Sequence, residues 1–514
     1  MRTVLALSGA LVLLLLAGCA SLPDDLGQEY SEGWQSPETT FLGALIAEAP
    51  EAADPGRSGV ELLSHPEEAF RARFYIANLA EESLDLQYYL WKDDLAGALL
   101  LWSALDAADR GVRVRFLIDD IYHAGRDDLY ALMDTHENFE VRVFNPMANR
   151  GLARYLNYAA NREQLNRRMH NKIFLADNAV AVLGGRNIGN DYFGIDTKAN
   201  FFDLDVLTTG AGTREAGAAF DEYWNSRWAV PIRVLHDPGY DQDDLDRGRK
   251  RLEAYLEELN VVPYELSLNR ETIVNDLREW RDQLTWTRAQ VIVDPLERFD
   301  GKGQSAFIAT DPDSRAPVYR ELIMQSAYLI PSQEGLDYMR ELVERGVRVR
   351  LMTNSLMSNN HITAHSGYLK YRKAILETGA ELHELRADAA LRERFRANQE
   401  EEVPAGIHTK SFVVDREQAL IGSFNLDPRS RELNSEIGLL VDSAEFAGEV
   451  AALMDTEFDL RNSYRLFLDD KGRLRWESVD DEGQRVVFTH DPHASAWKRG
   501  LARFLSWLPI EQEL

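Results

Sequence analysis

Residues 407–415, IHTKSFVVD, place a histidine, a lysine and an aspartate at intervals of two and five positions. Residues 169–177, MHNKIFLAD, carry the same three residues at the same intervals. The hexapeptide RGVRVR also occurs twice, at residues 110–115 and 345–350. Because both landmarks recur at almost one offset, they indicate the duplication of a domain-sized unit. The sequence therefore predicts two similar domains.

Each half also carries the same order of expected elements. In the first half, SLDLQYYLW (83–91) has the composition of a strand, residues 95–111 have helical periodicity, and residues 112–119 are again strand-like. In the second half, AYLIPS (327–332), residues 336–346 and residues 347–354 follow in that order. Strand, helix and strand in succession indicate a parallel crossover, which predicts an α/β fold.

The composition limits the class of protein. A chain of 514 residues with 45% hydrophobic and 28% charged residues is typical of a globular protein with two domains. The formal net charge of −28 repels phosphate backbones, so we expect no nucleic-acid partner. We expect a first domain over residues 41–236, a charged helical connector over 237–286, and a second domain over 287–514 that ends in a helix.

The N-terminus has the features of a targeting segment. Arg2 is followed by an apolar run that is shorter than the roughly 20 residues of a membrane span. The run ends in Leu16-Ala17-Gly18-Cys19, which resembles the cleavage box of bacterial lipoproteins. We therefore expect a signal peptide over residues 1–18 and a lipidated linker over 19–40, with the lipid on Cys19. Because Cys19 is the only cysteine, disulfides and cysteine-based metal sites are excluded.

The repeated motif suits the binding of a small anion. His170 and Lys172 are two residues apart, so on a strand both side chains leave the same face. A glycine at the following bend lets the backbone approach a ligand, and an asparagine amide can donate to an oxyanion. Both halves supply these residues fourteen and seventeen positions after the histidine: Gly184 and Asn187, Gly422 and Asn425.

The pattern HxKxxxxDxxxxxxG(G/S)xN, present twice, resembles the signature of the phospholipase D superfamily. Residues 88–94 (YYLWKDD), 366–385 and 508–514 (LPIEQEL) are similar to the bacterial cardiolipin synthases, the C type most closely. The resemblance extends from about residue 40 to the C-terminus. It implies two phospholipase D-like domains, each a mixed sheet flanked by helices, with the active site at their pseudo-two-fold interface.

The resemblance also implies roles for individual residues. His170 is the expected nucleophile, and His408 the general acid that later acts as base. The phosphate oxygens are assigned to Lys172, Lys410, Asn187, Asn425, Gly185 and Ser423. Asp203 and Glu436 are expected to orient the histidines, with Asp205 as a rival for Asp203. Asp177 and Asp415 complete the catalytic motifs, and we expect them to order the local structure more than to touch substrate. No metal or cofactor is expected.

The implied reaction joins two phospholipids. Phosphatidylglycerol is one expected substrate, and phosphatidylethanolamine is a candidate donor. The alternatives are hydrolysis by a phospholipase D, cleavage of nucleic acid and non-catalytic lipid binding. Ala20 after the lipidated cysteine resembles lipoproteins of the Gram-negative outer membrane, so we expect a protein that faces the periplasm and works at a membrane surface.

Two segments allow two interpretations each. Residues 146–169 carry five arginines and one glutamate, which could bind phosphate head groups or pair with the acidic domain. Residues 495–511 place apolar side chains at helical spacing among three cations, as in an interfacial membrane helix or a docking helix. The remaining histidines, His361 and His365 included, are expected to have packing or loop roles.

Overall fold

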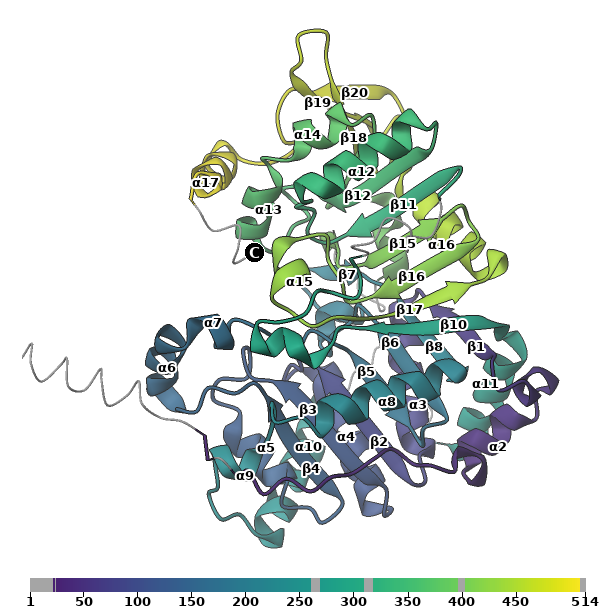
Figure 1. The fold of residues 1–514 in the computed structure, drawn as a ribbon, viewed down its shortest axis with the longest axis vertical. Helices are drawn as coiled ribbons and strands as arrows, with labels where there is room; N and C mark the ends of the chain where they lie inside the picture. Colours follow the sequence, from purple (N-terminus) through teal and green to yellow (C-terminus); the bar gives the residue numbers. More distant parts are fainter. Residues whose placement is uncertain (1–21, 24, 260–268, 309–317, 396–402, 509–514) are drawn as a thin grey trace, which may run out of the picture.

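The computed structural model describes residues 22–23, 25–259, 269–308, 318–395 and 403–508 (Figure 1). The expected signal peptide and Cys19 lie outside these residues. Within the described ranges, no helix combines the length and apolarity needed to cross a bilayer.

The first half is a mixed sheet with the strand order β9-β4-β3-β2-β5-β6-β8-β1. Strands β2, β3 and β4 are mutually parallel, and the remaining neighbours are antiparallel. The strands are β1 (Ser58–Leu63), β2 (Ser83–Tyr88), β3 (Arg113–Asp119), β4 (Phe139–Phe144), β5 (Ile173–Ala176), β6 (Val180–Gly184), β8 (Asp205–Gly210) and β9 (Ala229–Pro231).

The second half repeats this order as β18-β13-β12-β11-β15-β16-β17-β10, and a hairpin of β19 and β20 extends its outer edge. The strands are β10 (Thr285–Val293), β11 (Glu321–Ser326), β12 (Arg348–Asn354), β13 (Glu381–Leu385), β15 (Lys410–Val414), β16 (Gln418–Gly422), β17 (Ile437–Asp442), β18 (Ser463–Leu468), β19 (Leu474–Val479) and β20 (Arg485–Phe488). The expected duplication and the α/β fold class are confirmed.

Strand β10 joins the two sheets. Its residues 285–287 pair with β1, and its residues 288–293 pair with β17. In Figure 1 this long strand runs along the boundary between the two halves. A hydrophobic cluster with members from both halves, such as Phe220, Trp224, Leu439 and Met454, lies across the same boundary. The halves therefore form one packed body.

The helices lie on the faces of the sheets and in the connections. Those of the first half and the connector are α2 (Phe41–Ala47), α3 (Pro66–Leu79), α4 (Leu95–Asp109), α5 (Asp127–Met133), α6 (Arg154–Ala160), α7 (Arg162–Leu165), α8 (Ala211–Trp224), α9 (Ile232–Leu235), α10 (Gln242–Leu259) and α11 (Arg270–Gln283). Those of the second half are α12 (Gln333–Glu344), α13 (Ile362–Tyr368), α14 (Arg372–Glu377), α15 (Pro428–Glu432), α16 (Ala444–Glu457) and α17 (Ala496–Ser506).

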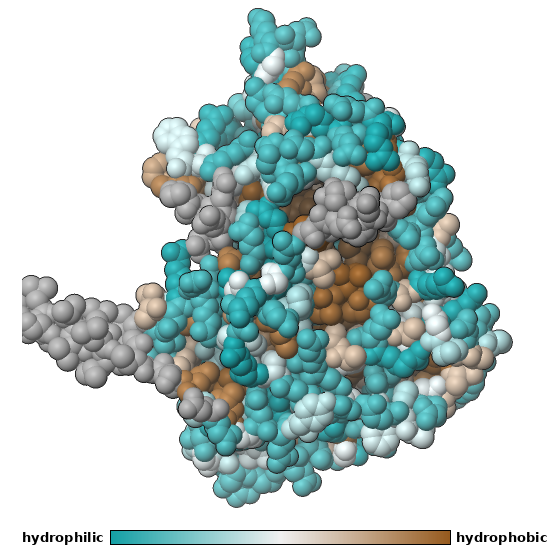
Figure 2. All heavy atoms as spheres, viewed as in Figure 1, coloured by the Kyte–Doolittle hydropathy of each residue, from teal (hydrophilic) through white to brown (hydrophobic). Residues whose placement is uncertain are grey.

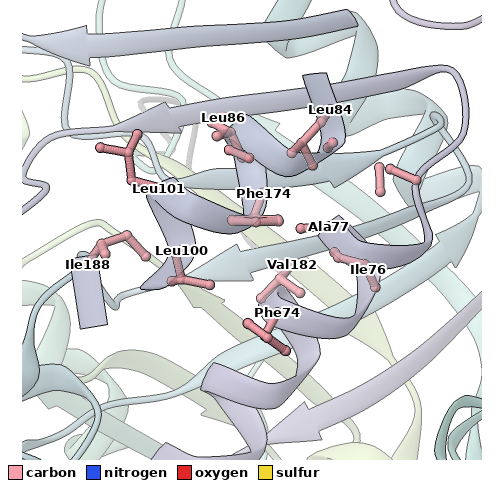
Figure 3. Close-up of a cluster of buried hydrophobic side chains, with 14 of the residues drawn as sticks. Phe74, Ile76, Ala77, Leu84, Leu86, Leu100, Leu101, Phe174, Val182 and Ile188 are labelled. Atoms are coloured by element: carbon pink, nitrogen blue, oxygen red, sulfur yellow. The ribbon is translucent and has the colours of Figure 1, made fainter. Parts of the chain in front are cut away.

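The alternation of β2 explains the core of the first half. Leu84 and Leu86 are fully buried and point to the side on which α3 and α4 pack. Figure 3 shows them gathered with residues of these helices and of the neighbouring strands: Phe74, Ile76, Ala77, Leu100, Leu101, Phe174, Val182 and Ile188. Asp85, one position out of phase, faces the other side and forms an ion pair with Arg115 of β3 at 2.6 Å.

The repeated RGVRVR marks the same helix-to-strand junction in both halves. Gly111 and Gly346 follow α4 and α12 with φ of 94° and 86°, a left-handed conformation that favours glycine and ends a helix. Each helix also begins at a side-chain cap, on Asp94 and on Ser332. These signals are local in sequence, which is why both helices lie close to their predicted positions.

One expected strand is wrong. The strand of the second half is β11 (Glu321–Ser326), and the apolar segment 327–332 that follows forms only a bridge between Leu329 and Leu426. The neighbouring strands β12 and β15 pair with β11 itself. Ala327, Leu329 and Ile330 are buried, so burial in the packed interior explains their apolar character, and ladder pairing does not.

Candidate active site

Each motif histidine is positioned by a short parallel pairing with the opposite half. Met169 bridges Ser435, and the His170 N–H donates to the Ser435 carbonyl at 2.9 Å. Strand β14 (Ala405–Ile407) pairs in parallel with β7 (Asn200–Phe202), and the His408 N–H donates to the Phe202 carbonyl at 2.7 Å. The residue after each pairing partner is an acid, Glu436 after Ser435 and Asp203 after Phe202. Each histidine therefore lies beside a carboxylate of the other half.

His170 is held by Glu436. Its Nδ1 lies 2.7 Å from Glu436 Oε2, and both side chains are buried. The hydroxyls of Ser423 and Ser430 donate to the same carboxylate at 2.5 and 2.7 Å. Burial alone would raise the pKa of Glu436, but His170, Lys172 and the Ser423 hydroxyl bring it below its usual value. Glu436 is therefore ionised and accepts a hydrogen bond from Nδ1–H of the ring.

His408 is held by Asp203. Its Nδ1 lies 2.6 Å from Asp203 Oδ2, and the Leu204 N–H donates to Asp203 Oδ1 at 2.9 Å. Burial would raise the pKa of Asp203, but its interaction with His408, which includes a hydrogen bond, and the positive charge of Lys410 lower it to about 2. The rival Asp205 instead forms buried ion pairs with Arg73 at 2.8 Å and Arg186 at 3.3 Å. Asp203 is therefore the orienting residue.

The environment keeps both rings neutral. Burial, the largest cause in each case, lowers the pKa of His170 to about 4 and that of His408 to about 3. A neutral ring whose Nδ1 donates to a carboxylate has its lone pair on Nε2, which is the form a nucleophile requires. A bound phosphate anion raises the pKa of a neighbouring imidazole, and this favours the protonated form that a general acid requires.

The two lysines bring buried cations beside the rings. Lys172 Nζ donates to the His170 carbonyl at 2.5 Å. Lys410 Nζ lies 2.9 Å from His408 Nδ1 and also donates to the His408 carbonyl. Burial lowers the pKa of Lys172 to about 7 and that of Lys410 to about 8. An ammonium has three N–H donors, so both lysines can also bind a phosphate oxygen, whose charge stabilises their protonated form.

The two asparagines have polar atoms available to a ligand. Asn187 Nδ2 donates to the Tyr192 hydroxyl at 2.9 Å, and within the described residues its buried Oδ1 has no hydrogen-bond partner. The same holds for the buried Oδ1 of Asn425. Half a turn of the Asn187 amide would let Tyr192 donate to its oxygen and free the NH₂ group for a phosphate oxygen. Rotation of the side-chain amide alone is therefore enough for the predicted role as a phosphate donor.

Gly185 and Ser423, which were predicted to bind substrate, lie against the two carboxylates. A Cβ on Gly185 would be 2.1 Å from Asp203 Oδ1, so only glycine allows this approach. Ser423 instead donates to Glu436. Their backbone N–H groups are already bonded to the carbonyls of Leu204 and Ile437, so these two residues position the acids.

Asp177 and Asp415 lie at the ends of β5 and β15 that are farther from the histidines. The Asp177 carboxylate accepts the backbone N–H groups of residues 81–83, where β2 begins. Asp415 does the same for residues 319–321 at β11. Both aspartates have positive φ, 53° and 54°. Their contacts order the fold, as expected, and give them no place among the reacting groups.

Aromatic residues that the sequence analysis did not identify enclose the rings. Tyr89 contacts His170 with ring centroids 4.8 Å apart, and Tyr122 contacts Tyr89 at 5.3 Å. Tyr192 and Phe201 lie 5.0 and 5.6 Å from His408. Of these residues, only Tyr89 had a signal in the local sequence, because it directly follows strand β2. Figure 1 places β5, β7 and α15, the elements around the site, between the two halves.

The arginine-rich segment before His170 is largely structural. Arg150 pairs with Asp120 and Asp127, and the fully buried Arg168 pairs with Asp119 at 3.2 Å. Arg154 donates to the Asp120 carbonyl at 2.9 Å. These three contacts support the second interpretation, in which the cations pair with the acidic domain. His365 is buried with Nε2 3.1 Å from Arg372 Nη2, as expected for a packing residue.

Comparison with known proteins agrees with this geometry. Residues 76–224 and 318–459 match the family described as "Cardiolipin synthase, PLD-like domain". The chain belongs to this family. It is 34% identical to cardiolipin synthase C of Escherichia coli K12 over 472 residues, which are 89% of this chain and 96% of that protein. An uncharacterized protein of Helicobacter pylori 26695 is 30% identical over 93% of each chain. The resemblance drawn from the two motifs is confirmed.

A solved structure shares the two-domain fold. The crystal structure of phosphatidylserine synthase from Haemophilus influenzae Rd KW20 is similar with a TM-score of 0.56 at 15% sequence identity. The similarity covers 89% of this chain and 95% of that one. At this sequence identity, the similarity supports only the fold of this cardiolipin synthase family member.

Proposed function

We propose that this protein is a phosphatidyltransferase of the cardiolipin synthase type. The observation that carries the proposal is the single buried site in which both complete motifs meet, with each histidine bonded to a carboxylate of the opposite half. A phosphodiester exchange needs one group that attacks phosphorus and one that protonates the leaving alcohol. His170 with a neutral ring supplies the first, and His408, protonated when the phosphate anion is bound, supplies the second. The full-length similarity to a cardiolipin synthase supports the same reaction.

The reaction proceeds in two displacements. In the first, Nε2 of His170 attacks phosphorus, the bond to the leaving alcohol breaks, and His408 gives that oxygen a proton. In the second, His408 takes a proton from the incoming alcohol, whose oxygen attacks phosphorus while the bond to His170 breaks. Lys172, Lys410, Asn187 and Asn425 neutralise the non-bridging oxygens throughout, which usually supplies the largest part of catalysis. Two inversions give retention at phosphorus.

The substrates we propose are phosphatidylglycerol, as acceptor and donor, and phosphatidylethanolamine as a further donor. The aromatic rings around the histidines support transfer to an alcohol, because they restrict the access of water to the phosphohistidine. If water nevertheless wins the second displacement, the product is phosphatidic acid and the protein is a phospholipase D.

A product analysis tests this function. The purified protein is mixed with detergent-dispersed phosphatidylglycerol, with and without phosphatidylethanolamine, and the lipids are identified by mass spectrometry. We expect cardiolipin from the unaltered protein and none from His170→Ala. His490→Ala, an exposed histidine outside the site, is the matched control and should leave the product unchanged. Phosphatidic acid as the main product would replace the transferase by the hydrolase.

We also propose that Cys19 carries the lipid of a periplasm-facing lipoprotein of the outer membrane, which places the active site at a membrane surface. The sequence Leu16-Ala17-Gly18-Cys19 supports this. Globomycin should block maturation, and Cys19→Ser should remove acyl chains detected by mass spectrometry. Mature protein without acyl chains on Cys19 would contradict the tether.

A further inference from the structure

Helix α17 presents large apolar side chains to solvent. The exposed fractions of Trp497, Phe504 and Trp507 are 74%, 57% and 83%, and Leu508 is also exposed. Of the ten large hydrophobic residues exposed in the described chain, four lie within residues 497–508. Scattered exposed apolar residues are ordinary, but a cluster marks a surface that meets an apolar partner. Figure 2 shows pale and brown residues at the position of α17, beside a largely hydrophilic surface.

The packing of α17 fixes the direction of this apolar face. Ala502 is fully buried against Leu356 and Ala494, with Ile362 and Leu369 of the α13 region packed beside them. The helix begins at a cap in which Ser495 Oγ accepts the Lys498 N–H at 3.1 Å. One face of α17 therefore docks on the domain, and the tryptophan face is held outward. The docking-helix interpretation holds for the buried face, and the exposed face is the one to which the interfacial interpretation applies.

The charge of α17 is opposite to that of the whole protein. Its sequence, AWKRGLARFLS, contains Lys498, Arg499 and Arg503 and no acidic residue, in a chain whose net charge is −28. Cations interleaved with tryptophan and phenylalanine are typical of helices that lie in the interface of an anionic bilayer. This charge is complementary to phosphatidylglycerol, whereas two whole copies of a chain with a net charge of −28 repel each other.

Contacts lead from helix α17 to the active site. The helix packs on α13, whose N-terminal His361 contacts the ring of Tyr328 at 6.0 Å between centroids. The residue after Tyr328 forms a bridge to Leu426, which directly follows the motif residue Asn425. From the half-exposed Tyr122 the chain of ring contacts passes through Tyr89 to His170.

A second exposed aromatic lies on the same side of the molecule. Tyr155 on α6 is 65% exposed, and in Figure 1 α6, α7, α13 and α17 all lie along the left side. The N-terminal described residues begin there too, where the Gly27 carbonyl accepts from Arg233 of α9. The side that carries α17 is thus also the side on which the described N-terminal residues begin.

We propose that α17 is a membrane-docking helix that inserts Trp497, Phe504 and Trp507 into the interface of an anionic phospholipid bilayer, with Tyr155 as a second contact, and so holds the entrance of the active site against the lipid head groups. The inference rests on the proposed function, because it names the surface through which phospholipid substrates reach the histidines.

The first test places a fluorescent probe on the helix. Because Cys19 is the only cysteine, the full chain with Cys19→Ser accepts an environment-sensitive fluorophore at Phe504→Cys alone. The matched control is Tyr319→Cys, a position whose tyrosine is 69% exposed and precedes β11 at the end of the strand away from Tyr328. Cys19→Ser also removes the proposed lipid tether, so insertion of α17 itself has to bring position 504 into the bilayer and distinguish it from position 319.

On vesicles of phosphatidylglycerol and phosphatidylcholine, we expect a blue shift and a severalfold rise in emission at position 504 and no change at 319. Vesicles of phosphatidylcholine alone should give a weaker response. No change at 504 on either vesicle overturns the proposal. A blue shift without vesicles that grows with protein concentration also overturns it, because a second copy would then cover the helix.

The second test separates docking from chemistry. The variant Trp497→Ala/Phe504→Ala/Trp507→Ala should lose about tenfold or more of its rate on vesicles, through weaker interfacial binding. Its rate on monomeric short-chain phosphatidylglycerol should be unchanged, and Tyr319→Ala should match the unaltered protein on both. An equal loss on both substrates overturns the proposal. If the unaltered protein turned over neither lipid, the proposed function would fail, while the probe at 504 would still report whether α17 docks.

Discussion

The two halves hold their histidines with the same strands but support the opposing carboxylates differently. The imidazole–carboxylate distances are nearly equal, 2.7 Å for His170 and 2.6 Å for His408. Glu436 also accepts two serine hydroxyls, whereas among the described residues Asp203 accepts a single further bond, from the Leu204 N–H. Duplication has therefore conserved the geometry at the ring and allowed its support to diverge. Such divergence fits two histidines with different tasks.

The largest effect should come from the histidines themselves. His170→Ala and His408→Ala should each lower kcat by about 10⁴-fold or more, since each removes a reacting group. A phosphatidyl ester with a p-nitrophenol leaving group needs little protonation. With this substrate His408→Ala should regain a burst of p-nitrophenol in rapid-mixing kinetics, and His170→Ala should not. A burst from His170→Ala alone would exchange the two roles.

Exchanging the supporting residues tests the difference directly. Gly185→Ser gives the first half the residue of the second, but its Cβ would lie 2.1 Å from Asp203 Oδ1. Displacement of Asp203 should misplace His408 and lower kcat by about 100-fold. Steady-state assays on detergent-dispersed lipid measure the loss. Activity near that of the unaltered enzyme would show that the two supports are interchangeable.

The reverse exchange should be milder. Ser423→Gly removes one donor from Glu436 but leaves Ser430 and His170 in place. Loss of one hydrogen bond to a charged group should lower kcat by about tenfold. The comparison of Gly185→Ser with Ser423→Gly in one assay gives the asymmetry, and a larger loss in Ser423→Gly would reverse our account of it.

The smallest effect on catalysis should come from the motif aspartates. Asp177→Asn keeps a side chain that tolerates positive φ but weakens the three bonds to the start of β2. The free energy of unfolding should fall by about 1–3 kcal/mol, while kcat per folded molecule stays within about twofold. Urea denaturation measures the first and active-site titration the second. A kcat loss comparable to that of His170→Ala would place Asp177 among the reacting groups.

Local signals made the fold and most of the site predictable. The histidine, lysine and asparagine of each motif lie within eighteen positions, so their spacing in the sequence survives in the structure. The glycine that ends each helix is equally local. The apolar segment 327–332 was wrongly predicted to be a strand because buried connections and buried strands have the same composition. Only their backbone hydrogen-bond partners distinguish them.

The resemblance identified the two orienting acids, but local spacing could not predict that each one binds the histidine of the opposite half, because this pairing joins residues far apart in the chain. Glu436 is 266 positions from His170, and Asp203 is 205 positions from His408. The spacing from asparagine to acid also differs, since Asn187 precedes Asp203 by sixteen positions and Asn425 precedes Glu436 by eleven. The aromatic neighbours Tyr192 and Phe201 depend on the same long-range contacts.

The crossed carboxylates have a consequence for a newly made chain. His170 has no acid to hold its ring until residue 436 has been synthesised and β17 has joined the sheet, and His408 needs strand β7 of the half made first. A fragment released early would carry one motif with an unsupported imidazole. The complete active site therefore forms only when most of the chain has been synthesised.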